Sequence, residues 1–204
     1  MKLSKFIFIT LILLSSFGCK KKEVSESDFG KDVLNSVFLE IVDSIYMDRR
    51  TMDPPPFSRT VDFKTGRRDT VGYQAILKKY WHDQDSIKKD KHRILIGVHD
   101  FVVSNGINDS KFDLTPFKSN KKFDFQYASK FPDEIYWDIN DKKSKMPVGI
   151  IKVHRIYFNK TKTFGTLSAW ASCGGGKCGQ GFTITIENKS GEWHISKIDV
   201  TSIS

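Results

Sequence analysis

The chain has 204 residues, of which 33 are lysine or arginine and 24 are aspartate or glutamate, so its formal net charge is +9. Sixteen phenylalanines, six tyrosines and four tryptophans favour a folded, sheet-rich protein and exclude a disordered chain with too little to bury. The length fits one domain, and the basic balance suits nucleic acid, anionic lipid or acidic glycan.

The first 18 residues have the order of a secretory signal. Lys2 and Lys5 precede an apolar stretch, residues 6–14, which is followed by two serines. Nine residues of helix span about 14 Å, whereas a bilayer core is roughly 30 Å thick. We therefore predict a signal peptide over residues 1–18 rather than a spanning helix.

A cysteine follows this signal directly. Ser16-Phe17-Gly18-Cys19 resembles the lipobox of bacterial lipoproteins, although Phe17 is bulkier than the usual residue there. The resemblance implies cleavage before Cys19 and acylation of its thiol, with palmitate among the acyl chains. Several acyl chains give stable anchoring where one gives only marginal binding. The alternative is an ordinary signal followed by a cysteine with no special role.

Residues 20–28 have little to bury, so we predict a lipidated tether over residues 19–28 and a single domain over residues 29–204. Loss of the signal removes two lysines and lowers the formal net charge to +7. Because an exported protein does not meet nucleic acid, the predicted partners are a membrane, through Cys19, and an envelope protein or glycan. The lysines are dispersed in pairs that we interpret as solvated faces: Lys78-Lys79, Lys88-Lys89, Lys121-Lys122 and Lys142-Lys143.

Apolar residues recur at helical spacing over residues 28–50 and predict an amphipathic helix. Asp28 or Ser27 is the expected N-cap, and Arg49 and Arg50 complement the dipole at the end of the helix, before three prolines.

In the middle of the chain, the sequence predicts shorter helices and strands. Val61 and Phe63 precede a turn signal at residues 65–66, which favours a small hairpin. Residues 74–81 predict a short helix that buries Ile76, Leu77, Tyr80 and Trp81, residues 93–103 a central strand, and residues 123–127 a further strand.

The last quarter contains four strand-like runs, residues 148–158, 163–173, 182–187 and 193–203, separated by short turn sequences. Short sequential loops indicate an antiparallel meander. We predict an α+β domain, with the N-terminal amphipathic helix packed on a mainly antiparallel sheet that ends in this four-strand meander.

The sequence from Cys173 to Gly181 has five glycines in nine residues and a second cysteine, Cys178. With Cys19 acylated, these two cysteines form an even pair in an oxidising compartment, which favours a disulfide. A metal site would recruit His154 or His194, and a redox site would need an exposed thiolate near Lys177. Both alternatives stay open from the sequence.

Residues 38–46, the cysteine-glycine loop and residues 191–204 together resemble a family of uncharacterised bacterial envelope lipoproteins. Members have a CGG-x-CG-x-G loop, then a G-x-W strand and a short I-S terminus, which here are Gly191-Glu192-Trp193 and Ile203-Ser204. This chain has one extra residue between its cysteines, which weakens the expectation of a fixed metal geometry. The resemblance implies an envelope lipoprotein and no particular activity.

No catalytic motif is evident, and we predict no catalytic residue, cofactor or metal ligand. The five histidines, His82, His92, His99, His154 and His194, are outside any HExxH or haem-attachment spacing, and no phosphate loop or nucleophile elbow is present. His99-Asp100 are neighbours on a predicted strand, where successive side chains point to opposite faces.

The leading hypothesis is a non-catalytic binding or structural module, anchored to a cell-envelope membrane. We expect the outer membrane and a periplasm-facing location, because Lys20-Lys21-Lys22 lacks the acidic cluster that resembles surface-export signals. The alternatives are an enzyme with a curved-sheet pocket of the cystatin-like or nuclear-transport-factor-like kind, and a thiol or metal protein acting through Cys173 and Cys178.

Overall fold

The computed structural model describes residues 25–52, 54–56, 65–66, 70–133, 146–173 and 178–203. The predicted signal peptide and the hairpin strands with Val61 and Phe63 lie outside these ranges. The helices are α2 (Glu26–Ile45), α3 (Arg49–Met52) and α4 (Thr70–Lys89), and two 3-10 turns are η1 (Thr115–Phe117) and η2 (Ala128–Lys130). The strands are β1 (Ile94–Val98), β2 (Phe101–Ser104), β3 (Ile107–Lys111), β4 (Phe123–Tyr127), β5 (Gly149–Val153), β6 (Tyr157–Phe158), β7 (Phe164–Ser172), β8 (Gly179–Lys189) and β9 (Glu192–Ile203).

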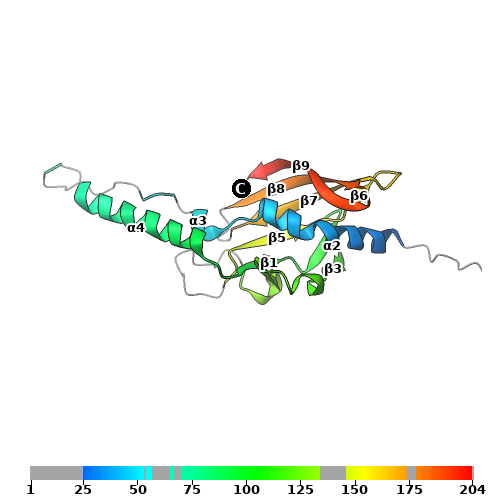
Figure 1. Cartoon of the computed structure of the whole chain (residues 1–204), viewed down its shortest axis with the longest axis horizontal. Coiled ribbons are helices and arrows are strands. Elements are labelled where there is room, and N and C mark those ends of the chain that lie inside the picture. The colour runs from blue at the N-terminus through cyan, green and yellow to red at the C-terminus, as the bar shows by residue number, and fades with distance from the viewer. Residues whose placement is uncertain are drawn as a thin grey trace, which may run out of the picture.

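A mixed, mainly antiparallel sheet forms one layer and α2 lies across it (Figure 1). The strand order is β4-β1-β5-β7-β8-β9, with β6 paired to β7, while β2 and β3 form a separate hairpin. The predicted α+β class and the C-terminal antiparallel meander are confirmed. The pairing of β1 with both β4 and β5 is parallel, which the sequence did not predict.

α2 begins earlier than expected. Ser25 is the N-cap, and its side chain accepts a hydrogen bond from the Asp28 backbone N–H, so the prediction of Ser27 or Asp28 is wrong. Residues 26–28, assigned above to the tether, are therefore helical. The apolar face of the helix is buried as its spacing predicts: Val33, Leu34, Val37, Phe38, Ile41, Val42 and Ile45.

The helix also ends earlier than expected, at Ile45 instead of residue 50, because Tyr46 is extended and the chain then joins the sheet. The backbone N–H of Arg49 donates to the Val148 carbonyl. Asp48 accepts from the Arg50 backbone N–H and so begins the short helix α3. A tertiary hydrogen bond thus overrides the helical pattern, and the two arginines belong to α3.

Aromatic rings from four segments meet at the centre of the contact between α2 and the sheet. Phe38 is fully buried, and its ring centroid lies 4.6 Å from that of Phe112, 4.7 Å from that of Phe117 and 5.4 Å from that of Phe125. Phe125 comes from β4, so this cluster fixes α2 against the parallel part of the sheet.

The predicted strand over residues 93–103 is two strands, β1 and β2, divided at His99 and Asp100. The Asp100 carboxylate accepts hydrogen bonds from the backbone N–H and hydroxyl of Ser129, at 3.1 Å and 2.6 Å. The His99 ring nitrogen Nδ1 lies 2.9 Å from the Phe101 carbonyl oxygen. These hydrogen bonds, one local and two to a distant residue, favour a bend, and β2 then turns away to pair with β3.

The predicted strand over residues 148–158 is divided as well, into β5 and β6. Between them, the Arg155 backbone N–H donates to the Val103 carbonyl of β2. The strand at residues 123–127 is confirmed as β4, at one edge of the sheet.

α4 is more than twice the length predicted and projects away from the sheet (Figure 1). Ile76 and Trp81 are 51% and 52% exposed, so the prediction that both are buried is wrong. Among the described elements, α4 contacts chiefly α3, near its C-terminal end, where Gln84 is buried and donates to the Arg50 carbonyl. The apolar spacing correctly predicted a helix. The prediction that the rest of the protein covers its apolar face was wrong for Ile76 and Trp81.

The two glycines Gly149 and Gly30 should respond oppositely to substitution by alanine. A Cβ at Gly149 would lie 2.4 Å from the Ser172 carbonyl oxygen and 2.5 Å from that of Met47, and neither backbone can yield cheaply. We expect Gly149→Ala to lower the free energy of unfolding by roughly 2 kcal/mol or more. Gly30, within α2, meets only a Phe158 ring atom at 3.8 Å, so Gly30→Ala should stabilise by about 0.5–1 kcal/mol. Urea denaturation measures both, and equal effects would contradict the packing described.

Candidate functional site

An open cleft of about 600 Å³ lies where α3, the end of α4 and the beginnings of β1 and β4 meet. Its volume is within the range of roughly 300–1,000 Å³ typical of small-molecule sites. It is lined by Tyr46, Asp48, Arg50, Thr51, Met52, Ile87, Lys88, Asp90, Lys91, His92, Ile94, Lys121 and Lys122. Five of these side chains are lysine or arginine, one is histidine, and two are acidic.

Parallel pairing of β1 with β4 brings two distant lysine clusters into this cleft. Ile94 is in register with Phe123, and the Ile94 backbone N–H donates to the Lys122 carbonyl. The residues that precede the two strands, among them Lys91 and Lys121, therefore lie at the same end of the sheet. Lys121 and Lys122 are exposed, as predicted for a solvated face, but the fold places them in one cleft with Lys91.

A network of charged side chains joins α3 to the end of α4 beside the cleft. The Arg50 guanidinium donates to both Asp48 carboxylate oxygens, with Nη2 2.7 Å from Oδ2, and its Nη1 lies 3.2 Å from Asp90 Oδ2. Asp90 Oδ1 lies 2.7 Å from Nδ1 of His92 and also accepts the His92 backbone N–H. The two acidic groups of the cleft are thus already engaged.

The same contacts shift the titration of the network. The backbone N–H and the ring of His92 lower the pKa of the Asp90 carboxyl, and the charge of Arg50 acts in the same direction. The hydrogen bond to Asp48 raises the pKa of Arg50, which stays protonated. Both shifts favour the charged forms that hold α3 to α4.

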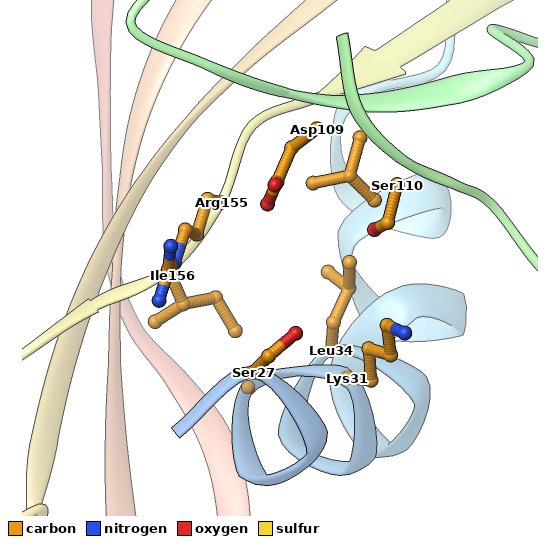
Figure 2. Close-up of a pocket in the computed structure, with 9 residues that line it drawn as sticks. Ser27, Lys31, Leu34, Asp109, Ser110, Arg155 and Ile156 are labelled. Atoms are coloured by element: carbon orange, nitrogen blue, oxygen red, sulfur yellow. The ribbon is translucent and has the colours of Figure 1, made fainter. Parts of the chain in front are cut away.

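A second, much smaller hollow lies at the beginning of α2, where Ser27 and Asp109 point toward a common space (Figure 2). Its volume of about 30 Å³ corresponds to roughly one water molecule. This hollow is too small for an organic ligand.

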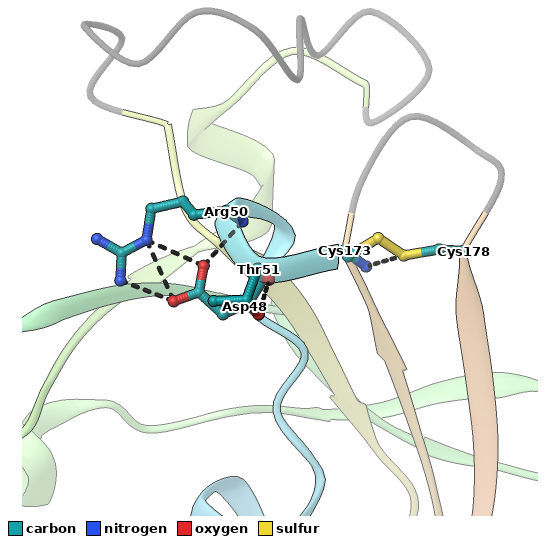
Figure 3. The surroundings of a disulfide bond; sticks show 5 residues. All are labelled: Asp48, Arg50, Thr51, Cys173 and Cys178. Carbon is teal, nitrogen blue, oxygen red and sulfur yellow. Dashed lines mark hydrogen bonds and ion pairs between the residues drawn. A yellow bond between two sulfur atoms is a disulfide. The ribbon is translucent and has the colours of Figure 1, made fainter. Parts of the chain in front are cut away.

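The structure joins Cys173 and Cys178 as a disulfide, as predicted, with their Cα atoms 5.7 Å apart. The Cys173 backbone N–H donates to the sulfur of Cys178 at 3.2 Å (Figure 3). Cys173 is buried, which does not fit the exposed thiolate that a redox site requires. Figure 3 places the pair beside α3, with Thr51 nearby.

A metal site that uses His154 or His194 with these cysteines is not formed. His154 follows β5, whose Ile150 pairs with Ser172, so it lies four residues, or about 13 Å along the strand, from that pairing. His194 is at the opposite end of β8 and β9, where it pairs with Glu187. Metal ligands must lie within about 2.3 Å of one ion. Over the described ranges, no three His, Cys, Asp or Glu residues gather closely enough to hold a metal.

The five histidines are spread over the fold rather than gathered at one site. Burial lowers the pKa of His154, and the charges of Lys152 and His99 act in the same direction. The Asp100 carboxylate is engaged by Ser129, so it does not orient the His99 ring. The face of the sheet where a curved-sheet pocket would lie is filled by α2 side chains such as Phe38 and Ile41.

Comparisons with models of protein families, with curated proteins and with solved structures find no match to this chain. The resemblance to envelope lipoproteins stays a prediction. In the part of the chain that the structure describes, no helix is both long and apolar enough to cross a bilayer.

Removal of the Asp90 charge should weaken the joint between α3 and α4 in a pH-dependent way. The pKa of the Asp90 carboxyl is lower in the folded state than in the unfolded chain. Its charged form therefore stabilises the fold above the unfolded pKa, and this stabilisation is lost as pH falls through the folded-state pKa. We expect Asp90→Asn to lower the free energy of unfolding at pH 7, and the difference from the parent to close below about pH 4. Asp85→Asn, which changes an exposed carboxyl on α4, the helix that Asp90 follows, is the control. Urea titrations at both pH values measure this, and a difference independent of pH would refute the assignment.

The disulfide between Cys173 and Cys178 should stabilise the folded state. Closure of a short loop constrains the unfolded chain by roughly 2 kcal/mol, so Cys173→Ser with Cys178→Ser should lower the free energy of unfolding by about that amount. Thermal unfolding without reductant measures it. If stability were unchanged while bound metal or thiol reactivity disappeared, the structural role would be wrong.

Proposed function

We propose that this protein is a non-catalytic binding module, anchored to a cell-envelope membrane by acyl chains on Cys19, in the outer membrane and facing the periplasm. The observation that carries the anchor is the order of the N-terminal sequence: lysines, a nine-residue apolar stretch, and Ser16-Phe17-Gly18-Cys19. The anchor holds the chain at the beginning of α2, because Ser25 caps that helix six residues after Cys19.

The binding role is supported by the cleft between α3, α4 and the sheet. It has the size of a ligand site and carries more basic than acidic side chains. The acidic groups there bind Arg50 and His92, so they serve the joint between helices. The cleft can therefore hold a negatively charged ligand.

Intact-mass measurement tests the anchor. Native protein is extracted from membranes, alkylated without reduction and measured under conditions that retain metals. We expect a chain that starts at Cys19 and carries acyl mass, with Cys173 and Cys178 protected from alkylation by their disulfide. The control is Cys19→Ser, which should lack the acyl mass and leave the membrane fraction.

A mature native chain without acyl mass would refute the lipid anchor. Alkylation of both Cys173 and Cys178, or added metal mass lost in the double serine variant, would instead favour the thiol or metal alternative. The anchor and the state of the cysteine pair are thus tested separately in one spectrum.

A further inference from the structure

The lining of the cleft between α3, α4, β1 and β4 has an unbalanced charge. Asp48 and Asp90 both bind Arg50, and Lys122 pairs with Asp43, which lies outside the cleft. Within the described ranges, Lys88, Lys91 and Lys121 are exposed and make no ion pair. Three cations therefore border the cleft with their charges available to a ligand.

These cations occupy two different walls. Lys88 is in the last turn of α4 and Lys91 follows that helix, while Lys121 precedes β4. The Arg50 fork, which would suit bidentate binding of one phosphate, is occupied by Asp48. Three separate ammonium groups suit a ligand with several spaced negative charges. They suit a single phosphate held by two hydrogen bonds less well, because that needs a free arginine.

Apolar surface lies between the charges. Tyr46, Ile87 and Ile94 are partly buried and Met52 is 46% exposed, all lining the same cleft. A small inorganic anion would not contact such apolar surface, whereas the C–H faces of sugar rings can pack on it. The cleft thus combines spaced cations with a partly apolar floor.

We propose that this cleft binds an acidic glycan, a polysaccharide whose sugars carry carboxylates. This rests on the proposed role as a binding module and names its ligand class. α2 spans 20 residues, or about 30 Å, between the tethered end and the cleft (Figure 1). That separation favours a ligand in the surrounding envelope over the headgroups of the bilayer that holds the anchor.

The test is calorimetric titration of the full mature protein in detergent micelles. The probes are an oligogalacturonate, a neutral malto-oligosaccharide of equal length, inorganic pyrophosphate, and micelles of the same detergent that contain phosphatidylglycerol. We expect the oligogalacturonate to bind, more weakly as salt rises, and the neutral sugar not to bind. Amide hydrogen exchange should show protection at residues 87–94 and 118–123.

A matched pair of variants separates the site from overall charge. Lys88→Gln, Lys91→Gln and Lys121→Gln together should weaken oligogalacturonate binding by at least about tenfold. Lys78→Gln, Lys79→Gln and Lys160→Gln remove the same charge from exposed positions outside the cleft, and should weaken it less than about threefold. Circular dichroism verifies that both variants are folded.

Equal weakening by the two variants would overturn the proposal, as would equal binding of the neutral sugar or no binding of the oligogalacturonate. Preference for pyrophosphate or for the phosphatidylglycerol micelles would replace the glycan with a phosphate or lipid ligand and also overturn it. Because acylation is read from the mass of the same sample, loss of the anchor is distinguished from loss of glycan binding.

Discussion

The apolar face of α2, packed across the sheet, is the contact on which the positions of the other elements depend. Its central ring, Phe38, touches aromatic rings that come from β4, from η1 and from the segment that follows β3. Burial of such rings contributes several kcal/mol each. The helix also protects the edge of the sheet, since the Glu40 carboxylate accepts the Ile195 backbone N–H of β9 at 3.3 Å.

The sequence predicted the parts of the fold whose pattern is local. α2 and the strands of the meander have apolar residues at regular spacing and turn residues between them, and both were found. It failed where a tertiary hydrogen bond decided the outcome. The Arg49 bond to Val148 ends the first helix, and the Asp100 bonds to Ser129 divide one predicted strand into two. Such partners are far apart in sequence, so no local pattern reveals them.

The same limit explains why the cleft was missed. Lys91 and Lys121 lie 30 residues apart in the chain and become neighbours only because β1 and β4 pair in parallel, with Ile94 opposite Phe123. A parallel pair needs a long connection, and the segment between β1 and β4 contains its own hairpin, which hides the relation. The cysteine pair was predictable because, with Cys19 acylated, two cysteines are left as an even pair in an oxidising compartment.

α3 links the cysteine loop, the cleft and α4, although it has only four residues. Gly149 lets the Met47 backbone, just before α3, approach Ser172, which is adjacent to Cys173. From the other side of α3, Arg50 reaches Asp90 and its carbonyl accepts from Gln84. α3 therefore lies between the cysteine pair and the Arg50 network, which forms one wall of the cleft. The cleft and the disulfide share this short helix as a neighbour, because the backbones of Met47, Gly149 and Ser172 approach closely.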